Sequence, residues 1–206
     1  MRRRWLSAAA LCALGVVTLG AADQAQTPPA KLVKADADRL EKKLAVILER
    51  GALTGPPGKA LRTTVTDREV NSYFKFQGAE VLPVGVVNPI IGILDAGRLT
   101  GVVTVDLDAV RKSKERAWSD PLAYITGVMD LKVTGRLTAA NGRGVFLLES
   151  ATLGGVPMPK AFLQEVVYFY SRSPESPAGF NLDQPFDLPQ RVRQVDFQRG
   201  SAVIVQ

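Results

Sequence analysis

The sequence predicts an α+β protein in which a curved antiparallel sheet of hairpins carries helices packed on one face. Apolar and polar residues alternate over several stretches after residue 98, with the period of β-strands. Short turn sequences that contain glycine join those stretches in pairs, as in hairpins. Residues 31–50 instead carry apolar side chains at helical spacing, and residues 160–171 form a mostly apolar segment behind a proline.

Residues 1–22 have the three parts of a secretory signal peptide: an arginine-rich start, a short apolar run and an exit of small residues. The run is shorter than the roughly 20 residues of a membrane span, which favours cleavage near Ala22 over retention as an N-terminal anchor. We therefore expect a periplasmic or secreted protein. The three arginines of this segment supply half of the formal charge of +6. Nucleic acid is not an expected partner, because no basic stripe with interleaved aromatic residues follows.

Residues 23–30 are expected to be a flexible lead and residues 31–206 a single α+β domain. The first helix is expected over residues 31–50, ending at Gly51, and a loop rich in glycine and proline follows. Thr66 and Glu69 have the spacing of a capping box, which predicts a helix that begins at Asp67.

Residues 81–94 are apolar but interrupted by prolines, which predicts an edge strand, a bulged strand or two short strands. A polar, basic helix is expected over residues 108–117, and an apolar helix over residues 160–171. The remaining strands are expected at residues 98–107, 128–138, 144–153, 192–198 and 201–205. Their hairpin turns are Asp95-Ala96-Gly97, Asn141-Gly142 and Arg199-Gly200.

Several kinds of chemistry are excluded by the residues that the chain lacks. It has no histidine, and Cys12 lies within the apolar run of the signal segment. Histidine-assisted nucleophilic catalysis, thiol chemistry and zinc sites with the usual ligands are therefore not expected. We expect no cofactor, no metal and no enzymatic activity.

Paired carboxylates are the remaining enzymatic possibility, because a glycosidase needs two acids across a cleft. The alternation places Glu149 in the inward register with Leu147 and Ala151, where it pairs with Lys132 or Arg136 or has a raised pKa. A bulge at this position, or a strand wetted on both faces, would place it differently. The candidate acids are Asp106, Asp108, Glu149, Asp183 and Asp187.

Several sequence features together resemble a family of exported bacterial proteins. They are Thr66-x-x-Glu69-Val70-Asn71, the alternating strands, an apolar helix behind Gly155-Val156-Pro157-x-Pro159, and a closing Leu188-Pro189-x-x-Val192-x-x-Val195. This pattern, over about residues 60–206, resembles the tubular lipid-binding proteins, in particular the LmeA-like phospholipid-binding proteins. The resemblance implies a curled sheet around a long helix that holds lipid without catalytic residues. The proline-broken segment 81–94 departs from the family pattern, and no functional residue is carried over.

The leading functional hypothesis is a non-catalytic envelope protein that binds a lipid or another apolar ligand. A helix that is apolar on nearly all sides is either deeply buried or lines an apolar cavity, and inward glycines on the strands leave room. The expected groove has one wall from the helix and one from the sheet. Its residues are Phe162, Val166, Phe169 and Tyr170, opposite Leu99, Val103, Val105, Val133 and Leu147.

Two further hypotheses concern surfaces. Cations beside a tryptophan suit peripheral contact with an anionic membrane, whereas a solvated connecting helix would have the same composition. The residues concerned are Arg111, Lys112, Lys114, Arg116 and Trp118. Alternatively, the core is fully packed and the protein is an envelope scaffold that binds a partner by strand addition at residues 81–94 or 201–206. A carboxylate-based hydrolase is the third function considered.

Overall fold

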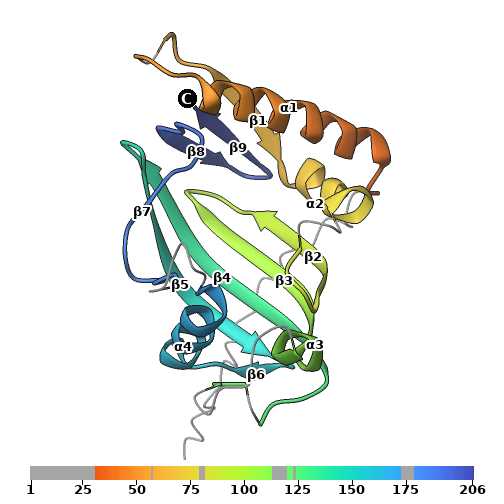
Figure 1. Cartoon of the computed structure of the whole chain (residues 1–206). Helices are drawn as coiled ribbons and strands as arrows, with labels where there is room; N and C mark the ends of the chain where they lie inside the picture. Colours follow the sequence, from red (N-terminus) through yellow and green to blue (C-terminus); the bar gives the residue numbers. More distant parts are fainter. Residues whose placement is uncertain (1–30, 57, 79–81, 113–119, 123, 173–178) are drawn as a thin grey trace, which may run out of the picture. The chain divides into compact units, whose positions relative to one another are not determined.

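The computed structural model describes residues 31–56, 58–78, 82–112, 120–122, 124–172 and 179–206 (Figure 1). Within these residues, nine strands form one antiparallel sheet that is accompanied by four helices, which confirms the α+β class. The helices are α1 (Lys34–Ala52), α2 (Asp67–Phe76), α3 (Leu107–Lys112) and α4 (Lys160–Ser171). The strands are β1 (Arg62–Thr66), β2 (Val86–Ile93), β3 (Arg98–Asp106), β4 (Val128–Ala140), β5 (Arg143–Leu153), β6 (Val156–Pro157), β7 (Phe186–Asp187), β8 (Gln194–Gln198) and β9 (Ser201–Val205).

The sheet is organised around β4, which pairs with β3 on one side and with β5 on the other. The β4–β5 hairpin has the predicted turn, in which Asn141 and Gly142 have φ angles of 53° and 76°. Positive φ at both central residues is the type I′ geometry that matches strand twist, and asparagine and glycine tolerate it best. On the face toward α4, Val103 pairs with Leu131 and Leu131 pairs with Leu153, so the three strands form continuous apolar rows.

A β-bulge at Glu149 changes which residues of β5 face inward. Thr134 pairs with Ser150 while the next residue, Gly135, pairs with Leu148, so Glu149 is the extra residue. A one-residue insertion moves the preceding side chains to the other face. The expected inward position of Leu147 is therefore wrong, and its side chain is 55% exposed. The inward position of Glu149 is corrected likewise, because it pairs outside with Arg98 at 2.7 Å and Arg136 at 3.7 Å.

The C-terminal strand lies inside the sheet. β9 pairs with β8 through the predicted turn and with β1, a strand that the alternation did not predict. The expectation of a free edge at residues 201–206 is therefore wrong. β8 in turn meets β4 at one position, where Val195 pairs with Ala139.

The segment around Pro89 forms a bulged edge strand, as predicted. β2 pairs with β3, and the register shifts between Val87 and Ile90, with Asn88 at a φ of 52°. The outward main chain of Ile91 is occupied by Asn71 of α2, whose amide donates to the Ile91 oxygen at 2.8 Å and accepts from its nitrogen at 2.7 Å. A bulge and a side-chain cover are two ways of protecting a sheet edge from another strand.

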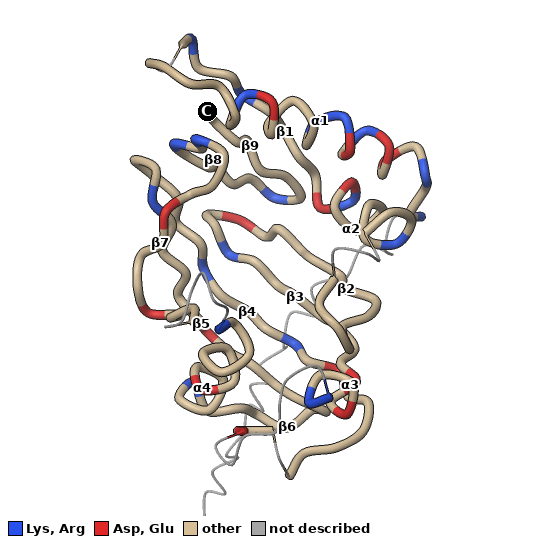
Figure 2. Tube along the Cα trace, viewed as in Figure 1, with Lys and Arg blue, Asp and Glu red and all other residues tan. Residues whose placement is uncertain are grey.

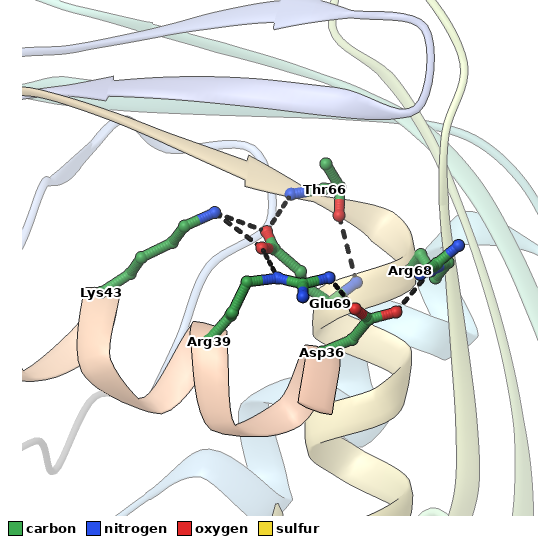
Figure 3. Close-up of polar contacts among 6 residues, drawn as sticks. All are labelled: Asp36, Arg39, Lys43, Thr66, Arg68 and Glu69. Carbon is green, nitrogen blue, oxygen red and sulfur yellow. Dashed lines mark hydrogen bonds and ion pairs between the residues drawn. The ribbon is translucent and has the colours of Figure 1, made fainter. Parts of the chain in front are cut away.

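Helices α1 and α2 are joined by a buried network of charges (Figure 3). The predicted capping box is present: Thr66 Oγ1 accepts from the Glu69 nitrogen at 3.2 Å, and Glu69 accepts from the Thr66 nitrogen at 3.0 Å. Lys43 of α1 donates to both carboxylate oxygens of Glu69, at 2.7 and 2.8 Å. Asp36 is fully buried and pairs with Arg39 and Arg68. The charged contacts join particular residues of the two helices. Beside them, α1 also buries an apolar stripe of Ala37, Leu40 and Ile47.

The two remaining helices agree with the sequence to different degrees. α4 has the predicted bounds, with Pro159 as its N-cap. α3 spans Leu107–Lys112, while the rest of the predicted helix, residues 113–117, lies outside the described residues. The predicted signal segment and lead, residues 1–30, also lie outside them. In the part of the chain that is described, no helix combines the length and apolar character needed to cross a membrane.

The charge network predicts acid-sensitive stability that depends on Glu69. Burial raises the pKa of Glu69, but hydrogen bonds from Lys43 and Thr66 and the Lys43 charge lower it below its ordinary value of 4.5. A lowered folded-state pKa means that the contribution is present above pH 4.5 and is lost as the pH falls through the folded value. Glu69→Gln should cost about 1–3 kcal/mol of unfolding free energy at pH 7.

Urea unfolding at pH 7 and pH 3 measures this effect. The difference between Glu69→Gln and the unchanged protein should shrink at pH 3. Glu49→Gln, at an exposed position of the partner helix α1, is the matched control and should change stability by less than about 0.5 kcal/mol at both pH values. An equal deficit of Glu69→Gln at both pH values would show that its charge is not what stabilises the helix pair.

Candidate apolar cavity

A cavity of about 300 Å³ lies between α4 and the inner face of the sheet. The sheet contributes Val105, Leu131 and Leu153, and α4 contributes a row one helical turn apart along one face. The remaining wall comes from the segment before β2, from α3 and from the residues around Leu122. The α4 row is Leu163, Val166, Val167 and Tyr170, and the other lining residues are Pro83, Val84, Val86, Leu107, Val110, Leu122 and Met158.

On the sheet, the cavity borders Val105, Leu131 and Leu153, and ordinary packing fills the neighbouring part of the inner face. Ala151, Leu163 and Leu182 form a buried cluster there, with Phe146 and Leu148 against it. Gly135 does not leave this space empty, since a Cβ there would overlap the ring of Phe146. The hollow part lies next to the inward side chains of Leu131, Leu153 and Val105.

Tyr170 is the lining residue whose side chain carries a polar group, a phenol hydroxyl. This hydroxyl has its hydrogen-bond partner within the protein. The hydroxyl donates to Asp120 Oδ1 at 3.0 Å, and the same carboxylate oxygen accepts from the Leu122 nitrogen at 2.9 Å. Burial and the bond to Asp120 raise the pKa of Tyr170. The phenol therefore stays neutral and hydrogen-bonded, and its ring contributes apolar surface to the cavity.

The structure brings together part of the predicted groove. Val105, Val166 and Tyr170 line the cavity. Val103 and Phe162 pack instead against the cluster of Val105, Leu107 and Leu122, and Val133 packs against Ala151, Leu163 and Leu182. Phe169 meets the ring of Tyr170 edge-on at 5.1 Å, Leu99 is half-buried and outside the lining, and Leu147 lies on the outer face because of the bulge.

Sequence reasoning missed the residues that close the cavity from the side. Leu131 and Leu153 share the inward alternation with Val133 and Ala151, so the strand pattern contained the signal for them. Leu107 is predicted at the end of the strand 98–107, and Val110 belongs to the segment 108–117 that is interpreted as polar and basic. Asp106 caps α3 by accepting from the Ala109 nitrogen at 3.0 Å, and this short helix buries Leu107.

The candidate carboxylates are held in separate structural contacts. Asp108 accepts hydrogen bonds from Arg111 at 2.6 Å and from the Gly127 nitrogen at 2.9 Å. The bond from Gly127 is the largest contribution to a pKa below the ordinary value of this carboxyl group. Asp183 pairs with Lys160, and Asp187 lies 3.7 Å from Arg143 at the surface. Among the described residues, no group of three or more Asp, Glu, Cys or His side chains is arranged to hold a metal ion.

The predicted membrane-surface residues are described only in part. Arg111 and Lys112 end α3, beside the cavity wall formed by Val110, and Arg111 is paired with Asp108. Lys114, Arg116 and Trp118 lie outside the described residues. Of the predicted membrane-surface segment, the structure therefore shows only α3, which lies at the cavity.

Comparisons with known proteins add little to this geometry. No family model matches the sequence, and no curated protein is similar to it. A solved structure, described as the crystal structure of lipopolysaccharide binding protein, aligns with 75% of this chain at 16% identity and a TM-score of 0.23. The aligned part is 45% of that chain, so this chain spans less than half of its length. At that TM-score the similarity supports no conclusion about the ligand of this chain.

Two inward glycines on neighbouring strands test this view of the packing. At Gly135 a Cβ would meet the Phe146 ring and come within 2.8 Å of the Leu147 carbonyl oxygen. At Gly101 it would meet Ile91 at an ordinary 3.7 Å. Gly135→Ala should destabilise the protein by about 1–3 kcal/mol, the usual cost of overpacking. Gly101→Ala should be neutral or stabilising by up to about 1 kcal/mol.

Chemical unfolding of both variants at pH 7 gives the comparison. Similar small effects at the two positions would mean that the Phe146 ring does not cover Gly135, and that the hollow space extends further along the sheet.

Proposed function

We propose that this is an exported, non-catalytic envelope protein that holds one apolar chain, such as an acyl chain, in the cavity beneath α4. The observation that carries the proposal is the cavity itself, whose lining side chains are aliphatic except for Met158 and Tyr170. Its volume of about 300 Å³ is at the lower end of the range for ligand pockets. That size suits one chain better than the whole body of a two-chain lipid.

The chemistry of the wall supports an apolar ligand over a polar one. A polar group placed against these residues would lose hydrogen bonds to water without replacement, at a cost of about 1–3 kcal/mol each. A methylene group placed there gains about 0.8 kcal/mol from burial. An acyl chain with its polar head outside the cavity satisfies both requirements.

The open end of the cavity has the character of a lipid-facing rim. Val84 lines the cavity and is 61% exposed. Val128 begins β4 at the same end of the sheet and is 65% exposed, while Val156, which pairs with the lining residue Leu153, is 66% exposed. Exposed apolar residues around a pocket favour contact with a membrane or another apolar surface. We therefore place ligand entry at this end.

The structure disfavours the alternative of strand addition at the two segments first considered. Residues 201–205 are paired on both sides, and the main chain of β2 is bulged and bonded to Asn71. Catalysis is left out of the proposal because Asp106, Asp108 and Glu149 have separate partners in a cap, a loop contact and an outer ion pair. Export rests on the sequence of residues 1–22.

Filling the cavity is the direct test. Val166→Phe adds a ring to the α4 wall, whereas Val145→Phe makes the same change at a site of β5 that is 44% exposed. Binding of the fluorescent fatty acid cis-parinaric acid should be saturable in the unchanged protein. It should weaken at least about tenfold, or ~1.4 kcal/mol, in Val166→Phe and stay unchanged in Val145→Phe.

Stability measurements and solvent extraction complete the test. In a packed core Val166→Phe would cost about 1–3 kcal/mol, but in a cavity it should cost less than about 1 kcal/mol. Mass spectrometry of an organic-solvent extract should find an acyl-chain compound bound to the purified protein. Absence of any extracted lipid together with no saturable fatty-acid binding would overturn the proposed function.

A further inference from the structure

A second pocket, of about 460 Å³, lies between the loop after α1 and the segment that leads into β8. It is lined by three arginines, Arg50, Arg191 and Arg193, together with Gln206 and apolar residues such as Leu53 and Val192. Figure 2 shows basic residues on the chain as it approaches β8. No carboxylate side chain is among the described lining residues.

The guanidinium groups of these arginines bond to main-chain oxygens. Such oxygens are uncharged, so they do not neutralise the positive charge of the arginines. Arg191 donates to the oxygens of Leu53 at 2.6 Å and Gly55 at 2.7 Å. Arg193 donates to the main-chain oxygen of Gln206 at 2.7 Å, and Arg50 bonds to the oxygen of Lys59. A carboxylate at Gln206 would balance one of the three charges and leave an excess of two.

Most N–H donors of the three guanidinium groups have no hydrogen bond to the described residues. Each guanidinium has five N–H donors, and the bonds just described use two from Arg191 and one from each of the others. The planar fork of a guanidinium matches the oxygens of phosphate and carboxylate groups. Charge-assisted bonds of this kind are about twice as strong as neutral ones.

Gln206 is a buried lining residue that is fixed by its side-chain amide. It is 5% exposed, and its Nε2 donates to the main-chain oxygens of Ile47 at 2.9 Å and Gln190 at 2.6 Å. These two acceptors fix the orientation of the amide. Its Oε1 is buried and has no hydrogen-bond partner among the described residues.

The pocket wall is held in place by main-chain bonds. The Gly142 nitrogen at the tip of the β4–β5 hairpin donates to the Arg193 oxygen at 2.8 Å, and the Leu188 nitrogen donates to the Gly142 oxygen at 2.8 Å. The Arg193 nitrogen donates to the Val205 oxygen at 2.8 Å. The main chain that carries Arg193 is thus fixed before any ligand binds, which lowers the entropic cost of binding.

From this arrangement we propose that the pocket binds a phosphate group, either free or carried on a small headgroup. Phosphate with a charge of about −1.5 to −2 balances an excess of two to three arginines better than a single carboxylate does. The shared chemistry of both sources is the phosphate oxygens on the arginine forks.

This site is separate from the apolar cavity and does not rest on the proposed function. Leu131 of the cavity and Gly142 of the pocket are at opposite ends of β4. At about 3.3 Å per residue they are more than roughly 30 Å apart along the strand. One acyl-chain compound therefore cannot place its chain in the cavity and its head on these arginines.

Titration calorimetry of the purified protein with inorganic phosphate, at constant ionic strength in chloride, tests the site. The expected result is one saturable site per chain, weakened at least about tenfold by Arg50→Gln and by Arg193→Gln. Arg199→Gln, whose side chain is 81% exposed, removes the same charge elsewhere and should change binding less than about twofold. Urea unfolding of each variant checks that the fold is kept.

A flotation assay with vesicles of phosphatidylglycerol and phosphatidylcholine distinguishes the two phosphate sources. Vesicle binding that is lost in Arg50→Gln and Arg193→Gln but kept in Arg199→Gln supports a lipid headgroup. Phosphate binding without vesicle binding supports a free phosphate compound. If neither probe binds through these arginines, or if Arg199→Gln weakens binding as much as the other two, the proposal is overturned. Fatty-acid binding in the Val166→Phe experiment is independent of each of these outcomes.

Discussion

The pairing of β4 with β3 and β5 is the constraint on which the rest of the structure depends. A strand side chain points to one face or the other, so the register of these three strands decides which residues meet α4. Val103, Leu131 and Leu153 form one row under the helix because of that register. The bulge at Glu149 then reverses the facing of the earlier part of β5 and moves a carboxylate to the outer arginines, Arg98 and Arg136. Without the bulge, the inward row would contain a charge.

The acids of this chain perform structural work at the ends and edges of elements. Asp106 caps α3, Glu69 completes a capping box and binds Lys43, and Asp36 is bonded by two arginines. A buried carboxylate costs several kcal/mol unless it is paired and hydrogen-bonded, and each of the two buried acids, Asp36 and Glu69, meets both conditions. The interface of α1 and α2 therefore gains specificity from its charges. Such pairs perturb a pKa without any catalytic purpose.

Much of the fold follows from local signals, and the parts that do not are decided by contacts between distant segments. Asn141-Gly142, the Thr66 capping box and the period-two alternation each act within a few residues, so the hairpin, α2 and the long strands could be predicted. The bulge at Glu149 shows only in the pairing of β4 with β5, because the residues of β5 alternate as they would in a regular strand. β1 is short and lacks alternation, so it too has no local signature. Three predicted groove residues line the cavity, but its side wall at Leu107 and Leu122 depends on α3 folding back against the sheet. The arginine pocket likewise combines segments from residues 50 to 206, which no spacing in the sequence reveals.

The apolar cavity also has an energetic consequence for the fold. Hollow space in a closed core costs about 24 cal/mol per Å³, so a sealed void of this volume would cost several kcal/mol, comparable with the stability of a whole domain. Part of that cost is removed here because the cavity opens beside Val84, which is well exposed. The remainder is offset either by a bound apolar chain or by α4 moving closer to the sheet. The second route is limited, because Leu163 of α4 is already packed against Ala151 and Leu182. A helix that is held against the sheet at Leu163 and borders a hollow would therefore gain stability from a ligand that fills the space its own side chains leave open.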